Sequence, residues 1–287
     1  MDLEAISGAA TVALTSTIVF LLIAKSWNAI GRTISSTPSF SDRIMHEAAQ
    51  RFRDELERLT SSQSIYLSGA LVFVMLFIAA YILRAQELFI GYPSWQLYLQ
   101  LAFLCLATGY ATFRLSRTVI AKRNVKFVRD ANIAIGHQLQ QLTTDGTRVF
   151  HDVATSAGVV DHVVVGQNGI YAVNVVARRS GKQGQVKMNG NVLQFSNSKI
   201  EYPIVYISGK TTRLAKEFHE ILGHTVRVRS VIALPGWELG EQLNEEHLLV
   251  CENTLAMFSG WKDESDYLMN EDVQALQKEL TARCKIS

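Results

Sequence analysis

Three long stretches without any charged side chain lie within the first 113 residues of this 287-residue chain. They cover residues 5–24, 60–83 and 88–113. A helix of roughly 20 apolar residues crosses the hydrocarbon core of a membrane. Because lipid offers no hydrogen-bond partners, a stretch that crosses it must be helical. We therefore expect three transmembrane helices, at about residues 5–24, 62–83 and 92–113. For the first stretch a buried core helix is the alternative, because Thr11, Thr15 and Thr17 make it less apolar.

The basic residues around these stretches indicate their orientation. Six Lys and Arg residues lie in 25–64, one lies in the short loop 84–87, and six more lie in 114–129. Cytoplasmic loops carry an excess of Lys and Arg, so we expect the N-terminus outside and the C-terminal half in the cytoplasm. The acidic start lacks the basic region of a cleavable signal peptide. The pattern predicts a multi-pass protein of a bacterial inner (cytoplasmic) membrane, with residues 1–121 as its membrane region.

The segment between the first two stretches has helical spacing. Apolar residues recur at Ile44, Ala48, Phe52 and Leu56, and most charged residues lie off this stripe. We expect a cytoplasmic amphipathic helix at 42–59 that packs on its own domain or on a second copy. A position on the lipid surface is the alternative.

The second half of the chain has the alternating pattern of an α/β domain. A helix is expected at 124–142, followed by strands at 149–153, 159–165, 170–176, 185–188 and 192–195. Asn168-Gly169 and Asn189-Gly190 are typical hairpin turns. A helix after Pro203 should end at Gly223, before strands at 226–234 and 247–251. The order predicts an α/β domain with a central mixed sheet at 122–265 and a C-terminal helix at 266–287.

One block within this domain resembles a known family. Residues 160–166 read Val-Asp-His-Val-Val-Val-Gly, and the turn Asn168-Gly169 leads into a second apolar strand. This block is similar to the nuclease-related domain, NERD, a branch of the PD-(D/E)xK endonuclease-like fold. Ser180-Gly181, Pro203 and the segment 233–236 add to a resemblance that spans about 124–261.

The resemblance implies a particular set of catalytic positions. In that fold an acidic residue on the first helix, an Asp on one strand and a Glu on the next hold a divalent cation such as Mg²⁺. The ion activates water, and a Lys two residues after the Glu stabilises developing charge. The matching positions here are Asn132, Asp161, Asn174 and Val176. Because one carboxylate of three remains and the Lys is absent, we assign no catalytic residue and expect no metal and no cofactor.

An active site with migrated residues is the alternative. Lys187 or Lys182 would then supply the cation, and Asp152 or Glu201 the missing carboxylate. Only in that case does the sequence predict a bound Mg²⁺ and an active metal-dependent nuclease.

The charge distribution suggests partners. Residues 114–229 hold 17 Lys plus Arg against 7 Asp plus Glu, whereas residues 230–287 hold 4 against 11. Arg178, Arg179, Lys182 and Lys187 are the candidate contacts for nucleic acid or another anion. A basic and an acidic half also suit contacts between copies or with another protein.

The sequence therefore predicts a membrane-anchored, catalytically degenerate NERD-like domain that acts as a binding or scaffolding subunit. Its expected partners are the lipid bilayer and a larger membrane assembly, either a homo-oligomer or a hetero-oligomeric complex. A nucleic-acid tether that does not cleave is a further alternative.

Overall fold

The computed structural model describes residues 3–34, 45–84, 94–141, 146–179, 184–242, 246–255 and 266–285. The chain separates into two compact units. The first comprises residues 1–37 and 55–125, and the second comprises residues 38–54 and 126–287.

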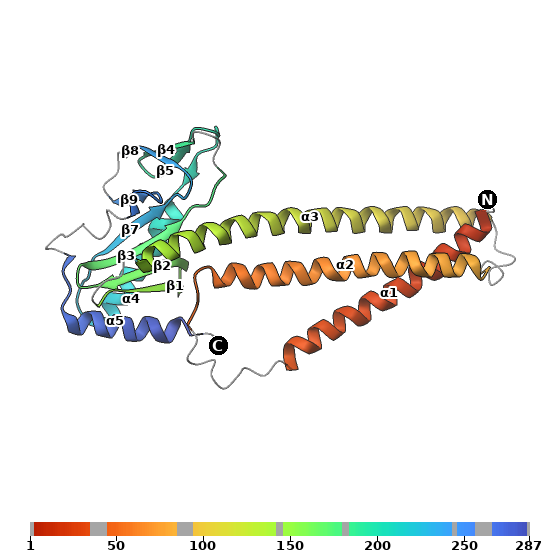
Figure 1. The fold of residues 1–287 in the computed structure, drawn as a ribbon, viewed down its shortest axis with the longest axis horizontal. Coiled ribbons are helices and arrows are strands. Elements are labelled where there is room, and N and C mark those ends of the chain that lie inside the picture. Colours follow the sequence, from red (N-terminus) through yellow and green to blue (C-terminus); the bar gives the residue numbers. More distant parts are fainter. Residues whose placement is uncertain are drawn as a thin grey trace. The chain divides into compact units, whose positions relative to one another are not determined.

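Three long helices supply the first unit. They are α1 (Leu3–Ile34), α2 (Gln50–Ile82) and α3 (Ser94–Gln141), shown in Figure 1. Two segments are long and apolar enough to cross a membrane: Gly8–Trp27, with mean hydropathy 1.8, and Gln50–Ile82, with mean hydropathy 2.4. The third expected span, 92–113, begins outside the described residues, and α3 is not among the candidate spans. Three spans therefore stay a prediction, and two candidate helices are what the structure supports.

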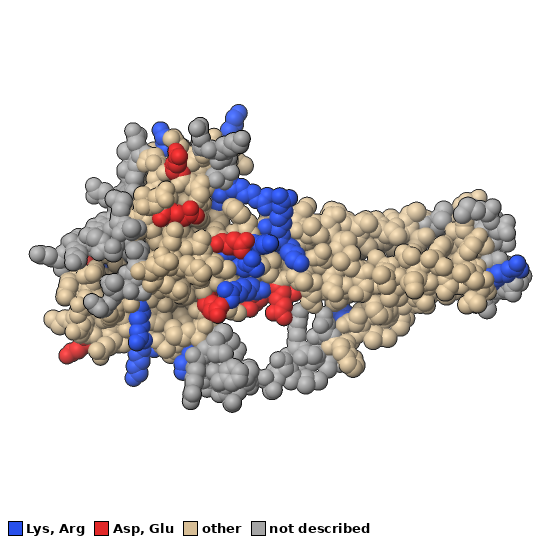
Figure 2. All heavy atoms as spheres, viewed as in Figure 1, with Lys and Arg blue, Asp and Glu red and all other residues tan. Residues whose placement is uncertain are grey.

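The surface of the helical unit is unusually apolar. Figure 2 shows a long surface with few charged side chains over much of these helices. Leu22, Leu71 and Leu106, one from each helix, are 61%, 67% and 71% exposed. Large exposed apolar surfaces mark contact with lipid or with another protein.

Two of these helices are longer than the sequence predicts. The expected amphipathic helix at 42–59 and the expected membrane helix at 62–83 form one continuous helix, α2, which starts at Gln50. The expected start of the amphipathic helix, at 42–44, lies outside the described residues, and residues 45–49 are not helical. Likewise α3 joins the expected helices at 92–113 and 124–142. No proline interrupts either helix, so the backbone hydrogen bonds can continue from one expected segment into the next.

A five-stranded mixed sheet forms the centre of the second unit, as the sequence predicts. Its order is β1-β2-β3-β7-β9, with β1, β2 and β3 antiparallel and β3, β7 and β9 parallel. The strands are β1 (Arg148–Thr155), β2 (Gly158–Gly166), β3 (Gly169–Val175), β7 (Val228–Ala233) and β9 (His247–Val250). Gly169, the first residue of β3, adopts a φ of 124°, a conformation that glycine tolerates best.

Helices cover both faces of this sheet. The helices α4 (Val205–Leu222) and α5 (Asn270–Arg283) pack on one face, where Leu214, Phe218 and Leu276 meet Phe150 and Val163. The end of α3 packs on the other face through Ile135 and Leu139. Helix α4 ends at Gly223, as predicted, with a left-handed φ of 76°.

A second, smaller sheet is formed by strands that precede and follow α4 in the sequence. Its order is β6-β5-β4-β8, from strands β6 (Tyr202–Pro203), β5 (Val192–Phe195), β4 (Gln185–Asn189) and β8 (Glu238–Gln242). The hairpin of β4 and β5 was expected, whereas β6, β8 and a separate sheet were not. Its apolar side packs through Val186, Met188, Leu193 and Trp237.

Candidate functional site

Two buried carboxylates face each other across β1 and β2. His151 pairs with His162 and Val153 pairs with Val160, so the register places Asp152 opposite Asp161. Asp152 is 6% exposed and Asp161 is 5% exposed. Like charges directly opposite each other destabilise a sheet. The pair therefore needs a counter-charge, and the sequence-based view of Asp161 as the sole anion of the site is incomplete.

Arg51, at the start of α2, supplies that counter-charge. Its Nε lies 3.3 Å from Asp152 Oδ1, and its Nη2 contacts Asp161 Oδ1. The backbone N–H of Arg51 also donates to Asp152 Oδ2 at 3.1 Å. The guanidinium lies 4.4 Å from the centre of the Phe52 ring. One Arg side chain thus bridges both carboxylates.

The other groups around Asp161 come from the backbone of β3 and from α4. The N–H of Val175 donates to Asp161 Oδ2 at 2.7 Å. Burial raises the pKa of Asp161, and Arg51, Val175 and Lys210 oppose that rise. Burial likewise raises the pKa of Asp152, with Arg51 opposing it. Lys210, on α4, has a pKa that burial lowers and Asp161 raises. The site therefore holds two carboxylates and two cations.

The family positions are only partly brought together. The pairing of His162 with Val173 places Asn174 opposite Asp161 on β3. Within the described residues, neither polar atom of the Asn174 side chain has a hydrogen-bond partner, although the residue is 2% exposed. Val176 lies in the apolar core of the small sheet. Asn132 donates to the Val128 carbonyl at 2.9 Å, and its backbone lies beside His162.

The opposite face of β1 and β2 carries a histidine pair. The Nδ1 atoms of His151 and His162 are 2.8 Å apart, and Gln140 Nε2 lies 3.0 Å from His151 Nε2. Burial and then His137 lower the pKa of His151 to about 4. Burial, then His151 and then Arg51 lower the pKa of His162 to about 3. Both rings are therefore neutral at neutral pH. His162 lies beside the backbone of Asn132 in α3, on the side of β2 away from Asp161.

The residues around Asp161 do not fit a divalent cation. Mg²⁺ and Ca²⁺ take six or more oxygen ligands, and even Mg²⁺, which keeps several waters, needs one or two carboxylates that are free to coordinate it. In the described part of the chain no group of three or more His, Cys, Asp and Glu side chains could hold a metal ion. The two carboxylates present contact a guanidinium, which repels a second cation.

Two of the proposed anion-binding cations lie over aromatic rings. The guanidinium of Arg178 lies 4.6 Å from the Phe195 ring centre, and that of Arg179 lies 5.5 Å from the Phe127 ring centre. The Arg178 carbonyl accepts a hydrogen bond from the Trp237 indole at 2.9 Å. Lys187 lies on β4, and Lys182 lies outside the described residues.

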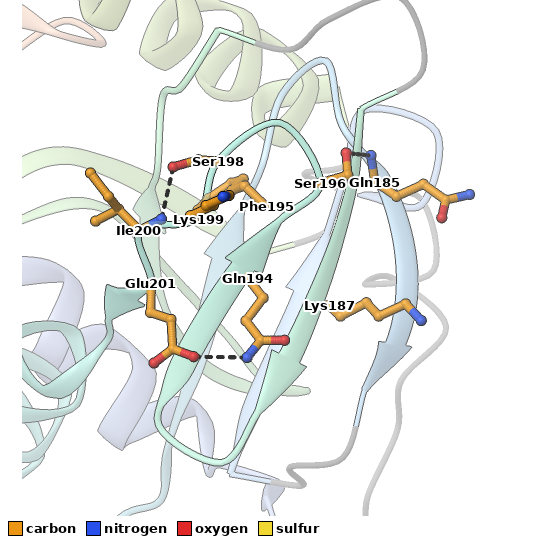
Figure 3. Close-up of a pocket in the computed structure, with 9 residues that line it drawn as sticks. All are labelled: Gln185, Lys187, Gln194, Phe195, Ser196, Ser198, Lys199, Ile200 and Glu201. Carbon is orange, nitrogen blue, oxygen red and sulfur yellow. Dashed lines mark hydrogen bonds between the residues drawn. The ribbon is translucent and has the colours of Figure 1, made fainter.

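A pocket of about 450 Å³ lies against β4 and β5, and Lys187, Lys199 and Glu201 line it. Gln194 donates to Glu201 at 2.9 Å, as Figure 3 shows. Lys187 and Glu201, two of the proposed migrated residues, thus belong to this pocket. The charged groups that act on the pKa of Asp161 are Arg51, Lys210 and Asp152. Asp152 alone among the described candidates joins Asp161.

Sequence reasoning missed Arg51 and Lys210. Arg51 is 110 residues away from Asp161 in the chain, and its helical spacing marks it as a solvent-facing charge. Lys210 is one of several cations on α4. No motif distinguishes either residue.

The comparisons with known proteins concern the same domain. Residues 129–235 match the family model described as the nuclease-related domain, NERD. The match contains all four family positions, and it confirms that a nuclease-related domain is present. Neither the curated proteins nor the solved structures yielded a match.

Proposed function

We propose that this chain is a membrane-anchored protein whose nuclease-related domain binds or scaffolds other molecules and does not cleave nucleic acid. The observation that carries the proposal is the chemistry around Asp161. Asn174 stands where the family has Glu, Val176 stands where it has Lys, and Arg51 contacts the remaining carboxylate. A hydrolytic mechanism therefore lacks its metal ligands and its lysine together.

The proposal places the domain in the cytoplasm, on an anchor of three helices in the inner membrane. The two candidate spans in α1 and α2 support it, as do the exposed apolar side chains of α3. A subunit with so much apolar helix surface suits a larger assembly of copies or of different chains. Extraction of native membranes with alkaline buffer tests the anchor, because the full chain should stay in the pellet. Release into the supernatant would contradict it.

A cleavage assay tests the catalytic part of the proposal. The full-length chain, purified in detergent, is incubated with Mg²⁺ or Mn²⁺ and with single- and double-stranded DNA and RNA. We expect all four substrates to stay intact. Asp161→Ala should change the melting temperature and leave the cleavage signal at background. Cleavage by the wild type that disappears in Asp161→Ala would refute the proposal.

An active nuclease with migrated residues is the second candidate, and one observation favours it. Asp152 lies opposite Asp161 and Lys210 acts on it from α4, so a second carboxylate and a lysine are present. Under this alternative both Asp152→Ala and Lys210→Ala should abolish a cleavage that the wild type shows. The same assay decides between the two functions.

A further inference from the structure

We infer that Arg51 is the built-in cation of this site: its guanidinium takes the place of a metal ion between Asp152 and Asp161 and fastens the segment 45–54 to the domain. The inference rests on the contacts within the second unit and does not require the scaffolding function. It assigns a role to a residue that lies outside the matched domain.

Three of the four carboxylate oxygens accept hydrogen bonds, and the fourth, Asp152 Oδ1, is ion-paired with Arg51 without one. Asp152 Oδ2 accepts from the backbone of Arg51, and Asp161 Oδ2 accepts from the backbone of Val175. The two remaining oxygens, one from each Asp, contact the guanidinium of Arg51. A metal ion would have to displace Arg51 from both. The planar guanidinium matches carboxylate geometry better than a lysine would.

The charges explain why a cation is required here. Two carboxylates that are 6% and 5% exposed lie opposite each other, and their ionised forms repel. The Arg51 side chain is 33% exposed, so it can reach both carboxylates and still keep part of its hydration. Removing one partner of a buried ion pair leaves an uncompensated charge, which destabilises much more than losing an exposed pair.

Arg51 also anchors the polypeptide that leads into α2. The same segment bonds the end of α5, where the His46 N–H donates to the Cys284 carbonyl at 2.7 Å. Met45 forms a bridge with Lys285, and Ala48 lies against Gly136 of α3. Arg51 lies in the first turn of α2, so this turn cannot shift without moving Arg51. We therefore expect the segment 45–54 to stay bound to the site through Arg51.

The experiment compares Arg51→Ala with Arg53→Ala in the full-length chain in detergent. Arg53 is the matched control, since it belongs to the same turn and pairs with the exposed Glu47. Arg51→Ala should lower the melting temperature by about 10 °C, because it leaves buried charges unpaired. Arg53→Ala should change it by about 2 °C or less. Equal melting of the wild type and Arg51→Ala would overturn the inference.

Charge neutralisation separates the loss of a cation from the loss of packing. Arg51→Met/Asp152→Asn/Asp161→Asn removes both buried carboxylates together with the guanidinium. Among the described groups that act on the pKa of Asp161, the only charge left is that of Lys210, which is partly exposed to solvent. We therefore expect this variant to recover most of the lost melting temperature. It also serves if Arg51→Ala does not fold. A triple variant as unstable as Arg51→Ala, or one that fails to fold as well, would show that Arg51 acts through packing and would overturn the inference.

Divalent ions provide a second readout that the cleavage assay does not share. Millimolar Mn²⁺ should leave the melting temperature of the wild type unchanged, because Arg51 occupies the carboxylates. It should raise that of Arg51→Ala by several degrees through binding to the folded state, and not that of Arg51→Ala/Asp161→Asn. Equal stabilisation of the wild type and Arg51→Ala by Mn²⁺ would show that Arg51 does not take the place of a metal.

Discussion

The two faces of the β1–β2 pair accommodate buried polar side chains in different ways. His151 and Asp152 are neighbours on β1, as Asp161 and His162 are on β2. On the α4 face the two carboxylates oppose each other and share the guanidinium of Arg51. On the α3 face the two imidazoles contact each other directly and remain neutral. Buried polar groups thus persist either with a counter-charge or without charge, and only the first solution needs a side chain from a distant segment.

The two faces also respond to pH in opposite directions. Burial lowers the pKa of His151 and His162, so the unfolded chain binds more protons than the folded chain below about pH 6.5. Their contribution to stability is complete above that pH and is lost as the pH falls. Burial raises the pKa of Asp152 and Asp161. Their contribution is present below the unfolded pKa and is lost as the pH rises through the folded one.

The largest of the remaining effects should come from the histidine face. We expect the unfolding free energy of the wild type to fall between pH 7 and pH 4. The shift of the His151 pKa from 6.5 to about 4 alone is worth on the order of 3 kcal/mol. His151→Gln/His162→Gln should have a flatter pH profile, because neither side chain titrates. Chemical denaturation at a series of pH values measures this.

His219→Gln is the matched control, since His219 is exposed on α4 and contacts neither histidine of the pair. Its profile should follow that of the wild type. If the double variant keeps the full pH dependence of the wild type, the buried pair is not its source.

The next largest loss of stability should come from a substitution of Gly136, which lies between the histidine face and the segment 45–54. A Cβ added to Gly136 would lie 2.7 Å from Ala48 Cβ and 3.4 Å from His162 Cε1. Neither neighbour is flexible, so Gly136→Ala should destabilise by about 1–3 kcal/mol, as overpacking does. A urea titration of the full-length chain measures the loss.

Gly209→Ala provides the comparison within a helix. Gly209 lies in α4, and among the described residues no atom other than those of its chain neighbours and of the adjacent helix backbone lies within 4 Å of the position that a Cβ would take there. Alanine favours a helix over glycine, so this variant should gain up to about 1 kcal/mol. A Gly136→Ala protein as stable as Gly209→Ala would mean that Ala48 does not pack against α3.

Local patterns predicted most of the α/β domain. Apolar alternation and the pairs Asn168-Gly169 and Asn189-Gly190 located both hairpins to within one residue, since the connecting residues are 167–168 and 190–191. Gly223 located the end of α4. The pattern failed for β6, which is two residues long, and for β8, whose sequence Glu-Leu-Gly-Glu-Gln is largely polar. Neither segment has enough apolar alternation to distinguish a strand from a loop.

Part of the site depends only on neighbouring strands. The placement of Asp161 beside Asn174 follows from the register of a tight hairpin, so the sequence contained it. The Arg51 contact joins residues 110 positions apart. Helical spacing identifies which side of α2 carries charge, but it contains no information on which carboxylate a charged residue meets. Long-range ion pairs depend on the tertiary fold and are therefore absent from local patterns.

Arg178 contacts an aromatic ring instead of a carboxylate, and its substitution should cause the smallest loss of stability. Its guanidinium lies over the buried Phe195 ring at 4.6 Å, and a cation–π contact of a partly exposed cation is worth about 1 kcal/mol. Arg178→Ala should therefore lower the melting temperature by only a few degrees, as a thermal scan beside Arg51→Ala would measure. The difference follows from what each substitution leaves behind, since an aromatic ring without its cation is still a satisfied apolar group. A loss as large as that of Arg51→Ala would mean that burial of the partner charge does not set the size of the effect.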